Sequence, residues 1–210
     1  MVHENKKLRR WGMVMFAALS VVLLSGVWLD REQAQLADSV LRLHVLANSD
    51  SQADQQLKEK VRDRVLAEAQ AILPPGAGLE QARRVLGDNL ERLAAAGADV
   101  VEEEGYAYPV AASLEQTWFP TKEYEDFSLP AGEYEALRVV IGEGGGQNWW
   151  CVVFPPLCLA SVSETAEQTA LESGLSEQQV ALMTGESEGY VVKFKAIELW
   201  EGFQRWLEGE

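Results

Sequence analysis

Residues 130–159 constrain the fold of this chain more than any other stretch of the sequence. They contain two apolar runs rich in β-branched and aromatic residues, 136–141 and 149–154, separated by a loop with four glycines. Such runs bounded by glycine are typical of two strands and their connection. Glycine also adopts positive φ at little cost, which a tight connection requires. The sequence therefore predicts a β-hairpin here, with the rest of the chain built around it.

The first thirty residues are expected to lie outside this fold. A basic cluster at residues 6–10 precedes nineteen uncharged residues, Trp11 to Leu29. About 20 apolar residues span a bilayer as a helix, whereas a signal-peptide core is usually shorter. Two interpretations of residues 1–30 stay open, a cleaved signal peptide and an uncleaved transmembrane anchor at residues 11–29. In both, the positive-inside rule places the chain after Asp30 outside the cytoplasm.

Two helices are expected after a buried strand at residues 40–46. Ser51 and the acidic residue three positions later resemble a capping box, and apolar residues at three- and four-residue steps continue to residue 72. Pro74-Pro75-Gly76 should end this helix. A second helix is expected from Leu79 to about residue 95, with Gly97 as its stop.

The order of elements indicates an α+β fold. An extended segment is expected at 106–112, an aromatic loop or strand end at 117–121, a loop at 122–129, and then the central hairpin. Strands grouped apart from helices favour an antiparallel sheet with helices packed on one face. Residues 31–160 should form an extracytoplasmic domain, and residues 161–210 a variable, acidic C-terminal tail with helices, including one at 176–183.

The charge and the reactive residues exclude several functions. A net charge of −15 argues against binding to nucleic acid. His44 is the only histidine after the hydrophobic segment. A zinc site usually needs three or four His, Cys or carboxylate ligands, and one histidine with two cysteines provides few of them. A serine triad would need His44, Ser49 and Asp50 or Asp54, but no Gly-x-Ser-x-Gly elbow is present. We therefore expect neither a metal nor a cofactor.

The two cysteines, Cys151 and Cys158, flank a Pro-Pro turn. In an exported protein they are plausible disulfide partners. Buried free thiols are the alternative, since cysteine also packs as a small apolar residue.

Four blocks of sequence, read together, carry a specific resemblance. They are residues 43–51 (LHVLANSDS), 129–138 (LPAGEYEALR), 141–151 (IGEGGGQNWWC) and 154–158 (FPPLC). Over about residues 38–160 the chain resembles the stage II sporulation protein R family. The resemblance implies a signalling protein, not an enzyme, that is exported into the space between the forespore and mother-cell membranes. Its implied partner is a membrane-embedded aspartic protease, which it activates to process the precursor of the early mother-cell sigma factor.

Candidate receptor contacts lie in the same blocks. They are His44, Asn48, Asp50, Glu133, Tyr134, Gln147, Asn148, Trp149 and Trp150. The competing interpretation is that these residues only hold the domain together, as helix caps and core. An envelope or peptidoglycan-associated hydrolase remains the alternative function, because export and a cleft would suffice for it.

Overall fold

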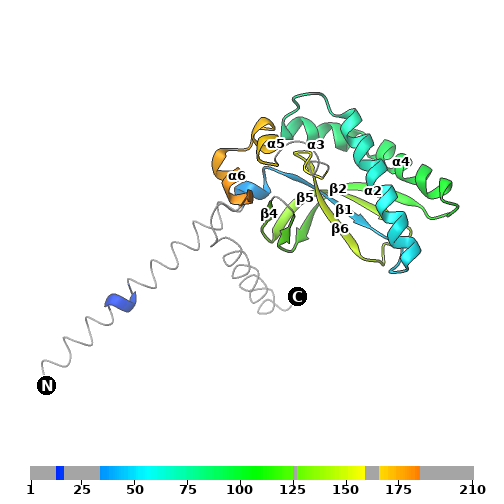
Figure 1. The fold of residues 1–210 in the computed structure, drawn as a ribbon, viewed down its shortest axis with the longest axis horizontal. Coiled ribbons are helices and arrows are strands. Elements are labelled where there is room, and N and C mark those ends of the chain that lie inside the picture. The colour runs from blue at the N-terminus through cyan, green and yellow to red at the C-terminus, as the bar shows by residue number, and fades with distance from the viewer. Residues whose placement is uncertain (1–12, 17–33, 125–126, 159–165, 185–210) are drawn as a thin grey trace, which may run out of the picture. The chain divides into compact units, whose positions relative to one another are not determined.

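The structure is a computed structural model that describes residues 13–16, 34–124, 127–158 and 166–184 (Figure 1). The chain divides into two compact units, Met1–Leu36 and Ala37–Glu210. In the first unit, residues 13–16 are helical. Most of the predicted anchor at residues 11–29 lies outside the described residues. Among the residues that are described, no helix has the length and apolar character needed to cross a membrane.

The second unit is built on a four-stranded sheet. Its strands are β2 (Val110–Phe119), β5 (Gly132–Ile141), β1 (Leu41–Leu46) and β6 (Asn148–Phe154), in that spatial order. β1 runs parallel to β5 and antiparallel to β6, and β2 is antiparallel to β5. The α+β class is therefore confirmed, but the expectation of a purely antiparallel sheet is wrong.

The predicted hairpin is also wrong, because β5 and β6 do not pair with each other. All six residues of β1 are buried, and β1 lies between the two strands as their common partner. A strand whose residues are all buried gains most from a central position, where both of its edges and both of its faces are covered. The glycine loop at residues 142–147 therefore crosses over the end of β1 instead of forming a tight turn.

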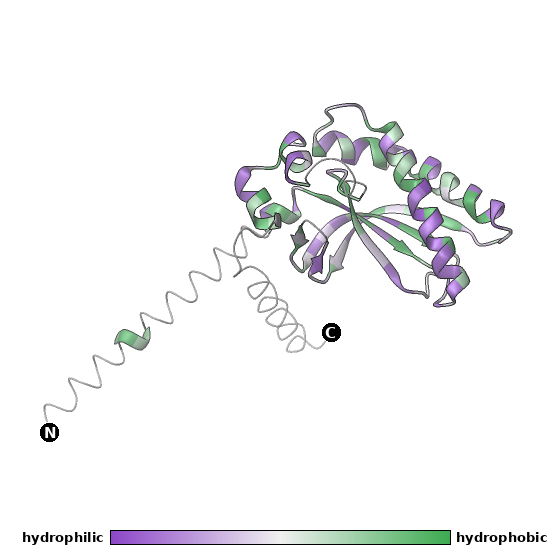
Figure 2. Cartoon of the chain, viewed as in Figure 1, coloured by the Kyte–Doolittle hydropathy of each residue, from purple (hydrophilic) through white to green (hydrophobic). Residues whose placement is uncertain are grey.

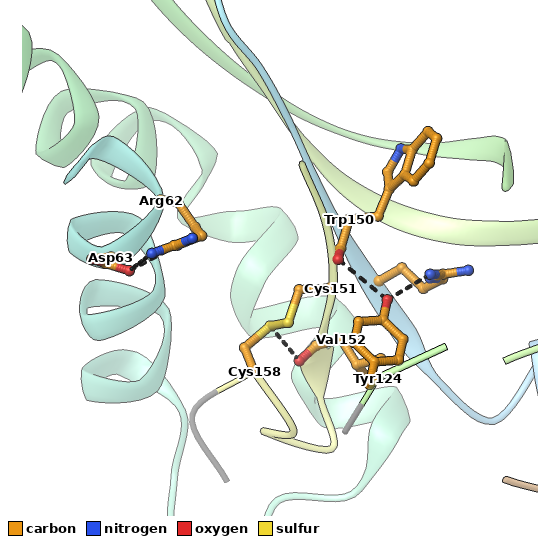
Figure 3. The surroundings of a disulfide bond; sticks show 8 residues. Arg62, Asp63, Tyr124, Trp150, Cys151, Val152 and Cys158 are labelled. Carbon is orange, nitrogen blue, oxygen red and sulfur yellow. Dashed lines mark hydrogen bonds and ion pairs between the residues drawn. A yellow bond between two sulfur atoms is a disulfide. The ribbon is translucent and has the colours of Figure 1, made fainter. Parts of the chain in front are cut away.

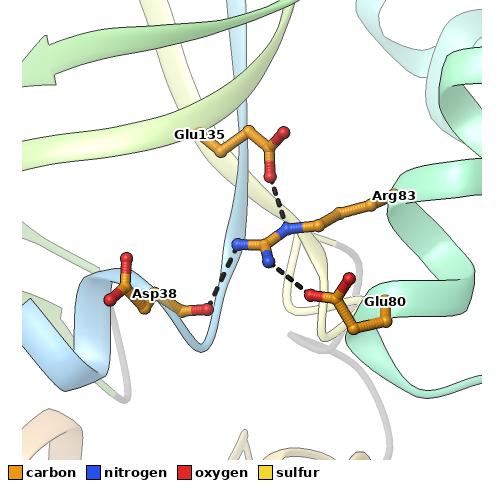
Figure 4. Close-up of polar contacts among 4 residues, drawn as sticks. All are labelled: Asp38, Glu80, Arg83 and Glu135. Atoms are coloured by element: carbon orange, nitrogen blue, oxygen red, sulfur yellow. Dashed lines mark hydrogen bonds and ion pairs between the residues drawn. The ribbon is translucent and has the colours of Figure 1, made fainter.

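Three helices cover one face of the sheet: α2 (Gln52–Ile72), α3 (Leu79–Asp88) and α4 (Leu90–Glu103) (Figure 1). Their apolar sides face the strands and their polar sides face outward (Figure 2). The predicted cap of α2 is confirmed, since Ser51 Oγ accepts a hydrogen bond from the N–H of Asp54 at 3.1 Å. Arg83 of α3 pairs with Glu135 of β5 and donates to the carbonyl oxygen of Asp38, which ties α3 to the sheet (Figure 4).

The second predicted helix is divided at Asn89, and Gly97 lies inside α4 instead of ending it. The side chain of Asn89 donates to the carbonyl oxygen of Val85 at the division. A Cβ at Gly97 would lie 3.1 Å from Cγ1 of Val110 and 3.2 Å from Cγ1 of Val61. Gly97 therefore allows α4 to pack closely on both β2 and α2.

The shorter elements are a ribbon between β2 and β5 in the chain and two helices after β6. Residues 122–129, expected as a loop, contain the two-stranded ribbon β3 (Lys122–Glu123) and β4 (Ser128–Leu129). The helix expected at 176–183 is present as α6 (Glu177–Thr184), and α5 (Ala166–Glu172) precedes it. The hydroxyl of Ser128 lies 3.5 Å from the carbonyl oxygen of Met183, so α6 packs beside the ribbon.

Candidate functional site

Two loops cross at the end of β1, and we call this contact the loop crossing. It joins residues 47–51, which follow β1, to the glycine loop at 142–147. The N–H of Gly146 donates to the carbonyl oxygen of Ala47 at 3.0 Å, and that of Gly145 to the carbonyl oxygen of Asn48 at 3.2 Å. Side chains add two further bonds, since the N–H of Glu143 donates to Asn48 Oδ1 and that of Gln147 to Asp50 Oδ1.

The glycines are needed because the two backbones approach so closely. Gly142 and Gly144 have φ of 61° and 64°, the left-handed region that other residues rarely adopt. A Cβ at Gly146 would overlap the carbonyl oxygen of Ser49 and lie 2.5 Å from its carbonyl carbon. The expected role of the glycines in allowing positive φ is therefore correct, and close approach is a second reason for them.

A buried carboxylate and a buried amine support the crossing from α2. Asp54 Oδ2 accepts from Ser49 Oγ at 2.5 Å and from Asn48 Nδ2 at 3.0 Å. These bonds, that from Ser49 first, lower the pKa of Asp54. Lys58 Nζ donates to the carbonyl oxygen of Gln147 at 3.0 Å, and burial lowers the pKa of this amine.

The residues considered for a serine triad are committed to other bonds. Ser49 donates to Asp54, whereas His44 Nε2 lies 2.7 Å from Asn148 Oδ1. The structure therefore does not assemble Ser49, His44 and Asp54 as a nucleophile, base and orienting acid. Within the described ranges, no group of three or more His, Cys, Asp or Glu side chains is placed to hold a metal ion.

The sheet face opposite the helices carries an aromatic group around Phe119. His44 is 8% exposed, and its ring lies 5.8 Å from that of Phe119 and 6.3 Å from that of Trp150. Burial lowers the pKa of His44, partly opposed by the bond to Asn148. The imidazole is therefore neutral near pH 7, as a structural histidine would be.

Arg42 lies at the centre of the same face and was not singled out from the sequence. It is fully buried, with its guanidinium carbon 4.0 Å from the centroid of the Phe119 ring and 4.8 Å from that of Tyr134. Its Nη2 donates to Tyr124 Oη at 2.8 Å, and Tyr124 in turn donates to the carbonyl oxygen of Trp150 (Figure 3). No sequence pattern indicated Arg42, because an arginine in a strand is ordinarily exposed.

The two adjacent tryptophans lie on opposite faces of the sheet. Trp149 faces α2, where the guanidinium of Arg62 lies 4.0 Å from its ring centroid. Trp150 belongs to the aromatic group on the other face. A single flat partner surface therefore does not reach both rings in the same way.

Exposure separates the remaining candidates. Tyr134 is 1% exposed and donates to the carbonyl oxygen of Pro130 at 2.7 Å, so its side chain is part of the core. Glu133 and Gln147 are exposed. Asp50 and Asn148 are exposed as well, but each already bonds another part of the domain.

Cys151 and Cys158 form a disulfide, with their Cα atoms 5.6 Å apart (Figure 3). This arrangement is the first of the two interpretations of the cysteines. Cys158 Sγ also lies 2.9 Å from the carbonyl oxygen of Val152. Because a half-cystine has no S–H, this is a contact and not a donated hydrogen bond. It holds the turn after β6 against the strand.

Comparison with known proteins identifies the family. The family model for stage II sporulation protein R matches residues 37–164. Stage II sporulation protein R of Bacillus subtilis (strain 168) is 40% identical over 134 residues, which are 64% of this chain and 60% of that protein. The chain thus spans less than two thirds of that relative, which is named as a sporulation protein and not as an enzyme. No solved structure matches. Since the family model covers more than half of the sequence, including β1, the loop crossing and the disulfide, the chain belongs to the stage II sporulation protein R family.

Proposed function

We propose that this protein is an exported sporulation signal that activates a membrane-embedded aspartic protease. The protease, in the mother-cell membrane, would then process the precursor of the early mother-cell sigma factor. The observation that carries the proposal is the family match over residues 37–164, which contains every candidate receptor contact. In this proposal the domain acts in the space between the two membranes, either released or tethered by residues 11–29.

The geometry is compatible with recognition by surface contact. The polar groups at the loop crossing bond one another, so they fix the shape of this end of the sheet. Gln147 is exposed at this end of the sheet, and Glu133 is exposed near the start of β5, at the other end; both lie in blocks that carry the family resemblance. A rigid surface with few exposed anchors suits a ligand that recognises one receptor, because little freedom is lost on binding.

The proposed mechanism is preferential binding. The domain would bind the active arrangement of the receptor more tightly than the inactive one and thereby raise its population. A ligand that bound both arrangements equally would shift nothing, however tightly it bound. The contacts that matter are therefore those that form only in the active arrangement.

Reconstitution in a non-sporulating host tests the proposal. The candidate receptor protease and a tagged sigma-factor precursor are expressed with the full chain, with an exported form of residues 31–210, or with neither. Processing of the precursor is followed on a gel. We expect processing only when one of the two forms of this protein is present.

The two forms also test the role of the N-terminal segment. Processing with residues 31–210 would show that the hydrophobic segment is dispensable, and processing with the full chain alone would show that tethering is needed. Absence of processing with both, when both are exported and folded, would refute the activator function.

A further inference from the structure

The outer edge of β2 has no neighbouring strand in the described residues. β2 is ten residues long and pairs with β5 along its whole length without a shift of register. It is the terminal strand of the sheet on that side. An edge strand presents a row of backbone N–H and C=O groups that another extended chain can pair with.

The hydrogen bond from the N–H of Gly142 to the carbonyl oxygen of Pro109, at 2.8 Å, shows which groups point outward. This pair continues the β2–β5 register by one step beyond Val110 and Ile141. In an antiparallel ladder, hydrogen-bonded and non-hydrogen-bonded pairs alternate. The residues opposite β5 in hydrogen-bonded pairs are therefore the odd-numbered ones. The even-numbered ones direct their backbone groups to the outer edge, and we use four of them, Val110, Ala112, Leu114 and Gln116.

These four residues are accessible, and within the part of the chain that the structure describes no strand pairs with their outward backbone groups. Gln116 is exposed, and the other three are half-buried. Natural edge strands are usually short, charged, interrupted by proline or a bulge, or covered. β2 carries one charged residue, Glu115, whose carboxylate lies 3.5 Å from Arg138 of the neighbouring strand. It contains no proline and no lysine.

The opposite edge of the sheet is protected, which makes β2 distinctive. On β6, the carbonyl oxygen of Trp150 accepts from Tyr124, and that of Val152 is in contact with Cys158 of the disulfide. The β1–β6 register also shifts near Arg42. A ribbon, a disulfide and an irregularity thus cover or distort one edge, while the longer edge is left regular and open.

The charge beside β2 indicates the chemistry of its partner. α4 packs against β2, and it presents the exposed acidic side chains Asp99, Glu102 and Glu103. The chain as a whole carries −15. A second copy would bring like charges together at this edge, whereas lysine and arginine residues beside an incoming strand would be attracted.

We propose that the outer edge of β2 binds an extended, basic segment of the receptor protease as an added strand. Main-chain hydrogen bonds from Val110, Ala112, Leu114 and Gln116 would supply affinity, as in other cases of strand addition. The basic flanks would orient the segment. This inference rests on the proposed function, because it takes the receptor as the source of the strand.

The first test uses substitutions in the full chain, in the co-expression host. Gln116→Pro removes an outward N–H, and Gln116→Thr is the matched control because it changes the same side chain but keeps the N–H. We expect Gln116→Pro to reduce receptor capture and precursor processing by about tenfold or more, since a strand bond and its local geometry are lost. Gln116→Thr should behave as the wild type.

The second test reads each amide and does not depend on Gln116→Pro folding. Hydrogen exchange of the full chain in detergent is measured by NMR with and without the receptor. Strand addition should protect the N–H groups of Val110, Ala112, Leu114 and Gln116, while the intervening amides, already bonded to β5, change little. Protection confined to other surfaces, or protection of β2 that depends on chain concentration without receptor, would overturn the proposal.

The wild-type arm separates this inference from the proposed function. If the wild-type chain does not cause processing, the activator function fails, and the receptor strand fails with it. If the wild type is active and a folded Gln116→Pro variant is equally active, only the strand-addition inference fails.

Discussion

Replacing Gly146 by alanine tests whether the loop crossing holds β6 in its position. The added Cβ would overlap the carbonyl oxygen of Ser49 and lie 2.5 Å from its carbonyl carbon, so the obstacle is backbone and cannot rotate away. The glycine loop must therefore move away from the turn after β1. Because β6 follows directly on the glycine loop and begins with Asn148, the displacement would reach the candidate receptor contacts Asn148 and Trp150.

The loss of unfolding free energy can be estimated from the hydrogen bonds between the two loops of the crossing. Separation of the loops weakens the bonds of the Gly145, Gly146 and Gln147 N–H groups to Asn48, Ala47 and Asp50. At about 0.5–1.5 kcal/mol for each bond, three bonds correspond to roughly 1.5–4.5 kcal/mol of unfolding free energy. For a chain of this size, that loss lowers Tm by on the order of 10 °C.

Gly145→Ala is the matched control in the same loop. Its Cβ would lie 3.4 Å from the carbonyl oxygen of Asn48, an ordinary contact. Urea denaturation of both variants, followed by tryptophan fluorescence, gives the two free energies. We expect Gly146→Ala to lose at least about 1.5 kcal/mol of unfolding free energy relative to Gly145→Ala. A difference within about 0.5 kcal/mol, the spread of ordinary surface substitutions, would refute the crossing as a structural constraint.

Three further outcomes follow from the titratable groups and the disulfide. The hydrogen bonds to Asp54 lower its pKa, so the ionised carboxylate stabilises the fold above about pH 4 and this stabilisation is lost as pH falls. The difference in unfolding free energy between wild type and Asp54→Asn should therefore narrow in acid. A difference that stays constant with pH would contradict this. Burial lowers the pKa of His44, so wild-type stability should decline as pH falls below about 6.5. His44→Gln should flatten that decline in pH-dependent urea melts, and an unchanged slope would assign it to another group. Replacing both Cys151 and Cys158 by alanine opens a short loop of sequence separation 7, and should cost about 2.5 kcal/mol under oxidising conditions. No further loss should follow when reductant is added to the double variant.

Local features of the fold were predictable because local chemistry determines them. The imperfect alternation of apolar and polar residues at 40–46 predicted β1, and Ser51 with Asp54 predicted the start of α2 to the residue. The cysteine spacing allowed the disulfide, although it left free thiols open. In each of these cases the residues that decide the structure are close together in the sequence.

Features that depend on distant partners were not predictable in the same way. The apolar runs at 136–141 and 149–154 looked like a hairpin because sequence patterns identify strands but not their neighbours, and β1 lies about 90 residues earlier. Gly97 looked like a helix stop because a glycine that permits close packing has the same local signature as one that ends a helix. Arg42 gave no signal, since its burial depends on Phe119 and Tyr134.

The loop crossing helps to separate candidate receptor contacts from residues that hold the fold together. Asn48 uses its side chain to join Asp54 to the glycine loop. This structural role explains an asparagine at this position without a receptor contact. Gln147 is different, because its backbone serves the crossing while its side chain is exposed. Asn48→Ala should therefore lower processing in step with Tm, whereas Gln147→Ala should leave Tm unchanged and lower processing only if the side chain contacts the receptor. Melting and processing measured together on both variants distinguish these roles. Loss of processing in a folded Asn48→Ala variant with wild-type Tm would show that the structural account of Asn48 is incomplete.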